Sequence, residues 1–167
     1  MTSDEPHALT YSDAFLRNIL RKVRAIAIVG ASDKPTRPSF GVFAFLVARG
    51  YRVIGVNPGV AGKSVHGAPF VESLADISEP VDMVDIFRSS EAAGMVVDEA
   101  LALEPQPKAI WMQLGVRNDA AAARAQAKGV KVVMDRCPKI EYERLLAGSV
   151  APRKSEARPK QRGRPRT

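Results

Sequence analysis

The chain of 167 residues is long enough for one domain with a full sheet and helices on both faces. Its single cysteine, Cys137, excludes an intrachain disulfide and is typical of a reducing compartment. No apolar run is long enough to cross a bilayer, so we expect a cytoplasmic protein that does not bind membranes.

The formal net charge of +7 is concentrated at the C-terminal end. Residues 152–167 hold seven basic residues and one acidic residue, so the rest of the chain is close to neutral. A nearly neutral body lacks the broad basic surface that nucleic-acid binding requires. We therefore expect a flexible N-terminus at 1–10, one folded domain at 11–148, and a disordered basic tail at 149–167.

Apolar, β-rich segments alternate with helical patterns along the chain. An amphipathic helix at 11–24, with Ser12 as its N-cap, precedes the first strand. Strands are predicted at 25–29, 51–56, 81–87, 108–112 and 130–134. Helices are predicted at about 39–49, 90–103, 120–127 and 140–146. Gly50 would end the first of these helices. Ser90 would be the N-cap of the second, and Asn118 or Asp119 the N-cap of the third. A small excursion between 60 and 70 has the pattern of a hairpin, and 73–77 that of a single helical turn. The alternation predicts an α/β fold with a doubly wound, mostly parallel, five-stranded sheet and helices on both faces.

The loop after the first predicted strand is short, polar and cationic. It begins at Gly30, and Lys34 and Arg37 precede the next helix, whose free backbone N–H groups also favour an anion. The loop matches neither the dinucleotide fingerprint nor the P-loop. After the second strand, where an NAD-binding fold places a carboxylate, this chain has Asn57, and an amide does not repel a phosphate.

Polar residues follow all five predicted strands. Because the carboxyl ends of parallel strands meet at one edge, which is where doubly wound sheets bind ligands, we expect these residues to gather there. The candidate binding residues are Gly30, Ala31, Ser32, Lys34, Arg37, Pro38, Asn57, Pro58, Phe87, Arg88, Gln113, Leu114, Gly115, Arg136 and Cys137.

Five motifs at these strand ends form a set. They read G-A-S-D-K-P-x-R-P, V-N-P, D-I-F-R, W-M-Q-L-G and M-D-R-C-x-K, in this order. The set resembles the stand-alone CoA-binding domain family, which is similar in turn to the N-terminal domain of the succinyl-CoA synthetase alpha subunit. The resemblance spans residues 16–145 and implies a Rossmann-like fold that holds coenzyme A or an acyl-CoA across the strand ends.

Matched motif by motif, the resemblance assigns each part of CoA to its own residues. Residues 30–34 and 37–38 would face the phosphates, 57–58 and 87–88 would flank the adenosine, and 113–115 with 136–137 would line the pantetheine. The synthetase also needs a phosphohistidine from a second domain and a separate nucleotide-binding subunit. This chain has only His7 and His66, so we expect neither ligase catalysis nor a metal site.

Three classes of function stay open at this stage. The favoured class is a non-catalytic binder of CoA or acyl-CoA that acts as a carrier, sensor or regulator. A second is an enzyme that uses NADP or an acyl-CoA. A third is a metabolite sensor whose tail, residues 153–166, contacts DNA weakly through the AT-hook-like segment 162–166. Cys137 is interpreted as a packing residue, with a mixed disulfide to CoA as the alternative.

Overall fold

The computed structural model describes residues 9–147, and the expected basic tail and most of the expected flexible N-terminus lie outside them. The helices are α1 (Asp13–Lys22), α2 (Pro38–Ala48), α3 (Ser90–Leu101), α4 (Asp119–Ala127) and α5 (Pro138–Leu145), with single turns η1 (Pro58–Val60) and η2 (Leu74–Asp76). The strands are β1 (Ala25–Val29), β2 (Arg52–Val56), β3 (Ser64–Val65), β4 (Ala68–Val71), β5 (Met83–Ile86), β6 (Ala109–Met112) and β7 (Lys131–Val133).

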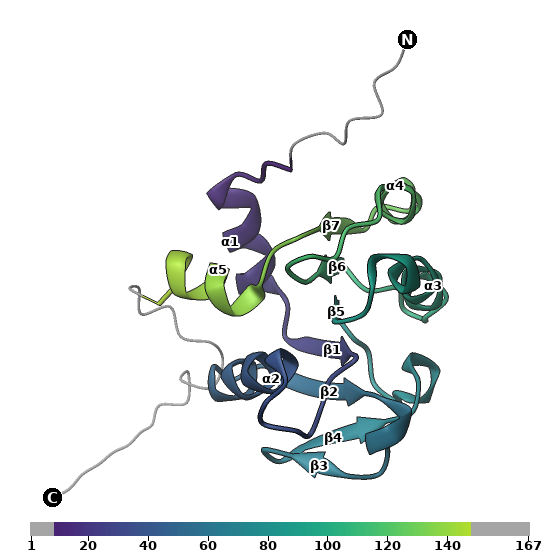
Figure 1. Cartoon of the computed structure of the whole chain (residues 1–167). Helices are drawn as coiled ribbons and strands as arrows, with labels where there is room; N and C mark the ends of the chain where they lie inside the picture. Colours follow the sequence, from purple (N-terminus) through teal and green to yellow (C-terminus); the bar gives the residue numbers. More distant parts are fainter. Residues whose placement is uncertain (1–8, 148–167) are drawn as a thin grey trace, which may run out of the picture.

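All strands belong to one sheet with the order β3-β4-β2-β1-β5-β6-β7. Every neighbouring pair is parallel except β3 with β4. The chain runs outward from β1 through β2 to the β3–β4 edge, then returns to β5 on the other side of β1 (Figure 1). The strand order therefore reverses between β1 and β5, which confirms the doubly wound prediction and locates the switch point where such sheets bind ligands.

The expected strand count of five was too low, because the hairpin between residues 60 and 70 joins the sheet. Its second strand, β4, pairs in parallel with β2, where Gly55 lies opposite Phe70. A side chain at Gly55 would approach the Phe70 ring to 2.5 Å, so the glycine leaves the space that the ring fills. The strand β3 has only two residues, too few to show an alternating pattern in the sequence.

Helices cover both faces of the sheet (Figure 1). Helices α1, α2 and α5 pack on one face around Phe43, Trp111 and Tyr142. Helices α3 and α4 pack on the other face around Val84 and Met112. Among residues 9–147, none of the helices combines the length and the apolar character that crossing a membrane requires.

The helix ends follow the predicted capping residues with one exception. Ser12 and Asn118 cap α1 and α4, and Gly50 adopts a positive φ just after α2. Helix α3 is capped one residue earlier than expected, because the Ser89 hydroxyl, not that of Ser90, accepts a hydrogen bond from the Ala92 N–H at 3.0 Å. The Ser90 hydroxyl instead accepts the N–H of Arg117, in the loop after β6.

Candidate anion-binding site

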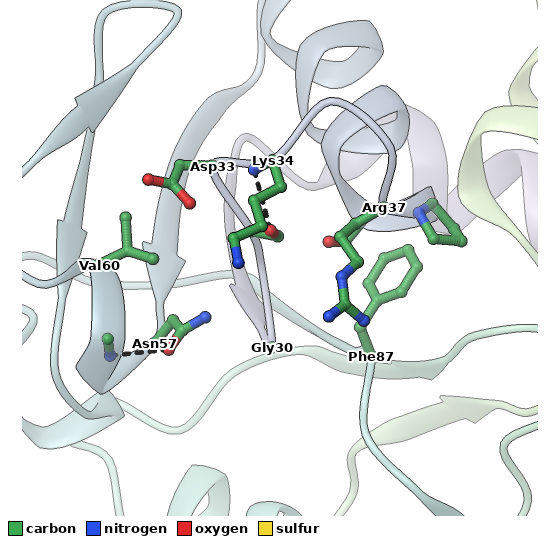
Figure 2. A pocket seen from close by; sticks show the side chains of 11 residues that line it. Gly30, Asp33, Lys34, Arg37, Asn57, Val60 and Phe87 are labelled. Carbon is green, nitrogen blue, oxygen red and sulfur yellow. Dashed lines mark hydrogen bonds between the residues drawn. The ribbon is translucent and has the colours of Figure 1, made fainter.

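An open pocket of about 460 Å³ lies at the C-terminal ends of β1, β2 and β5, next to the switch point (Figure 2). The first turn of α2 completes its wall. Its lining residues are Gly30, Ser32, Asp33, Lys34, Arg37, Pro38, Ser39, Asn57, Gly59, Val60 and Phe87. Two of these lining residues are basic, Lys34 and Arg37, and both side chains point from the β1–α2 loop into the pocket (Figure 2).

The β1–α2 loop folds on itself through short-range hydrogen bonds. The Lys34 N–H donates to the Ser32 hydroxyl at 3.0 Å, and the Arg37 N–H donates to the Lys34 carbonyl at 3.0 Å. Both basic side chains are exposed, and neither forms an ion pair within residues 9–147. Their charges are therefore available to a ligand.

Gly30 brings two strand ends together at the bottom of the pocket. Its φ is +90°, a conformation that L side chains rarely adopt, and an added Cβ would lie 2.2 Å from the Phe87 carbonyl oxygen. The Phe87 N–H donates to the Val29 carbonyl at 2.8 Å, so β5 leaves the sheet directly beside β1. Only glycine fits this close approach, and it keeps the pocket floor free of a side chain.

Asn57 connects the loops after β1 and β2. Its amide Nδ2 donates to the Ala31 carbonyl at 2.7 Å, and its Oδ1 accepts the Gly59 N–H at 2.9 Å. The side chain thus holds η1 against the β1–α2 loop. A neutral amide performs this role without placing a negative charge in the pocket.

The N-terminus of α2 adds further positive potential. Arg37 is its N-cap and Pro38 its first residue, and no side chain within the described part of the chain caps it. The first N–H groups of an uncapped helix remain for solvent or a ligand, and the helix dipole makes this end favourable for anions. Together with Lys34 and Arg37, this end of the helix gives a site suited to phosphate groups.

One carboxylate, that of Asp33, also lines the pocket. Its Oδ2 lies 3.6 Å from the Nζ of Lys63, which belongs to the turn between η1 and β3. His66, in the same hairpin, packs edge-on against Phe40, with ring centroids 5.1 Å apart. Residues 9–147 hold no group of three His, Cys, Asp or Glu side chains that could bind a metal ion.

The structure brings together the predicted residues of the first three strand ends, with three differences. The Ala31 side chain is buried in the core, so only its backbone faces the loop. Pro58 starts η1 and is not part of the lining, which its neighbours Gly59 and Val60 supply instead. Arg88 is exposed outside the lining, although its Cδ lies 3.2 Å from the position of a Cβ on Gly30.

The predicted residues after β6 lie outside this pocket. Gln113 is buried, and its Oε1 has no hydrogen-bond partner within the described residues. Leu114 is 56% exposed. The Gly115 N–H donates to the Asp135 carboxylate at 2.7 Å, which ties the loops after β6 and β7 together.

The predicted residues after β7 are held by the fold itself. The Arg136 guanidinium donates to the carbonyls of Asp135 and Leu9, both at 2.9 Å, and lies over the Tyr11 ring. Cys137 is 5% exposed, belongs to the core and is the N-cap residue of α5. The segment before α1 therefore covers this end of the sheet.

The sequence prediction did not include one lining residue of the pocket and one buried carboxyl outside it. Ser39, in the first turn of α2, lines the pocket and is buried, whereas the sequence indicates only that a helix begins there. Asp85 lies in the middle of β5 with no exposed surface, and neither carboxylate oxygen has a partner among the described residues. Burial raises the pKa of Asp85 well above its ordinary value. The sequence does indicate this buried carboxyl, because Asp85 is an acidic residue inside an otherwise apolar strand.

Comparisons with known proteins identify the family of the chain and agree with its fold. The model of the CoA binding domain family matches residues 24–143. The Bacillus subtilis protein YneT is 37% identical over 131 residues, which cover 78% of this chain and 94% of YneT. A Thermus thermophilus structure is 38% identical with a TM-score of 0.76, covering 81% of this chain and 100% of its own. A Pyrococcus horikoshii structure is 32% identical with a TM-score of 0.77, covering 87% and 100%. The chain therefore belongs to the CoA binding domain family.

Proposed function

We propose that the protein binds coenzyme A or an acyl-CoA, with the ligand's phosphates in the pocket between β1, β2 and β5, and that it acts as a non-catalytic carrier, sensor or regulator. The observation that carries this proposal is the pair of cations Lys34 and Arg37 at the N-terminus of α2: among residues 9–147 neither forms an ion pair, and no side chain caps this helix end. Positive charge and free backbone N–H groups both favour a pyrophosphate there, and membership of the CoA binding domain family supports CoA as its source.

The rest of the ligand would extend along the same edge of the sheet. Asn57 and Phe87 offer an amide and an aromatic ring to the adenosine, and both line the pocket. The pantetheine would run toward the loops after β6 and β7, where Leu114 is exposed. We assign Cys137 a packing role, because it is buried in the core between β7 and α5.

The anion pocket alone does not separate CoA from NADP, since both ligands carry a pyrophosphate and a ribose phosphate. Isothermal titration of the full chain with CoA, acetyl-CoA and NADP⁺ makes this distinction. We expect binding of CoA or acetyl-CoA and much weaker binding of NADP⁺. Stronger binding of NADP⁺ than of either CoA species would contradict the proposal.

The variants Lys34→Ala and Arg37→Ala test the position of the phosphates. Removing a cation that hydrogen-bonds a phosphate should weaken CoA binding by about tenfold or more. A larger loss for CoA than for dephospho-CoA would place the side chain on the 3′-phosphate, and an equal loss would place it on the pyrophosphate. Unchanged CoA affinity in both variants would contradict the assigned site. Arg124→Ala, which removes an exposed arginine of α4 outside the pocket lining, is the matched control.

A further inference from the structure

The anion pocket contains a carboxylate, which would repel a bound phosphate. Asp33 lies between Ser32 and Lys34 in the β1–α2 loop and lines the same cavity. A carboxylate near a bound phosphate raises the energy of the complex, and low dielectric strengthens the repulsion. A site that binds phosphates needs a way to reduce this repulsion.

Lys63 is placed to do so from a different part of the chain. Its Nζ lies 3.6 Å from Asp33 Oδ2, although Lys63 itself is not among the lining residues. Two backbone hydrogen bonds fix its position, from the Lys63 N–H to the Val60 carbonyl at 3.1 Å and from the Phe70 N–H to the Lys63 carbonyl at 3.0 Å. The turn that contains Lys63 directly follows η1, which supplies two lining residues, Gly59 and Val60.

The orientation of Asp33 agrees with this role. Figure 2 shows its carboxylate pointing away from the Lys34 and Arg37 side chains. Instead of pairing with either cation of the pocket, the carboxylate pairs with Lys63. Lys34 and Arg37 keep their charges for the ligand as a result.

The pair contributes little to folding stability. The Lys63 side chain is 64% exposed and that of Asp33 is 30% exposed. Ion pairs with this exposure are worth little, because water and salt screen them. A loss of Lys63 should therefore affect ligand binding without affecting the fold.

We propose that Lys63 is a positioning residue of the anion site, which acts through Asp33 by neutralising its carboxylate and holding it away from the ligand's phosphates. This inference rests on the proposed function for the identity of the ligand. It assigns a binding role to the η1–β3 turn, because the affinity for phosphates would then depend on a residue of that turn.

A double-mutant cycle on the full chain tests the inference, with Lys63→Ala, Asp33→Asn and the double variant. Dissociation constants for CoA and for inorganic pyrophosphate are measured by calorimetry at low salt. Lys63→Ala should weaken both ligands about two- to fivefold, the range expected from an exposed ion pair. In the Asp33→Asn background the same change should have no effect, and Lys63→Arg should keep wild-type affinity.

Lys108→Ala is the matched control. Lys108 pairs with Asp82 at 3.5 Å, and the two residues directly precede β6 and β5, at the strand ends opposite the pocket. It removes the same charge and should leave both affinities unchanged. An equal loss from Lys63→Ala in both backgrounds would show that Lys63 contacts the ligand directly and would overturn the inference, as would no loss at all. If the wild type binds pyrophosphate but not CoA, the proposed function fails while the pyrophosphate cycle still decides the role of Lys63; if it binds neither, both fail.

Discussion

Asp85 makes the stability of this protein depend on pH in a direction that can be calculated. Its carboxyl lies in β5 between Ile28 of β1 and Trp111 of β6, with no exposed surface and no hydrogen-bond partner among residues 9–147. Burial without a partner disfavours the charged form, so the pKa of Asp85 is raised well above its ordinary value. The folded protein keeps a proton that the unfolded chain releases near pH 4.

The sign follows from proton linkage. Above the unfolded pKa the native state binds one more proton than the unfolded state, so the free energy of unfolding falls as the pH rises. The contribution of Asp85 is fully present below the unfolded pKa and is lost as the pH rises toward the folded pKa. The slope is about 1.4 kcal/mol for each pH unit between these two pKa values. Asp85→Asn removes the titrating group and should remove this slope.

Urea denaturation of the wild type and Asp85→Asn, from about pH 5 to about pH 8, measures the effect. The unfolding free energy of the wild type should fall relative to that of Asp85→Asn as the pH rises. The pH at which the difference between the two proteins stops changing gives the pKa of Asp85 in the folded protein. Asp98→Asn is the control, since Asp98 is exposed and paired with Arg124. A difference between wild type and Asp85→Asn that stays constant over this range would refute the assignment of a protonated carboxyl.

Three further predictions concern the pocket and its surroundings. Gly30→Ala should destabilise the fold by at least about 2 kcal/mol more than Gly129→Ala in urea denaturation, because both glycines have positive φ but only Gly30 would meet backbone atoms; equal losses would contradict the clash. Asn57→Asp should weaken CoA binding by about tenfold in calorimetry, because it places a charge beside the phosphates; unchanged affinity would argue against phosphates at this place. Arg136→Ala should speed amide exchange at residues 9–12, since it removes the hydrogen bond to the Leu9 carbonyl; exchange at the wild-type rate would show that the Tyr11 contacts suffice.

Much of the fold was predictable because its central strands are continuous apolar runs. In β1 all five residues are buried, which is the pattern of a strand covered on both faces. The cap residues Ser12 and Asn118 were also readable, since each precedes a helical pattern and the capping interaction is local. The β3–β4 hairpin was expected, but its membership of the sheet depends on the long-range fit of Phe70 over Gly55, which no local pattern carries.

The site was predictable only where the chain forms it locally. Lys34 and Arg37 follow β1 directly, and the topology places this loop at the switch point. The position of Arg136 could not be predicted, because its partner, the Leu9 carbonyl, lies 127 residues earlier in the sequence. The apolar strand around Asp85 indicates its burial, but no local pattern shows what surrounds its carboxyl, since its neighbours Ile28 and Trp111 come from two other strands.

The location of the pocket and its ligand class have different causes. The location follows from the strand order, because β1 has β2 on one side and β5 on the other, so the loops after all three must meet. The proposed ligand class rests on a few side chains on those loops, since the body of the chain is close to neutral and provides no general attraction for anions. A change at Lys34 or Arg37, which are exposed and form no ion pair within residues 9–147, should therefore leave the fold intact while removing the proposed preference for phosphates. Affinity measurements on variants of these residues, more than further comparison of folds, will decide what this protein binds.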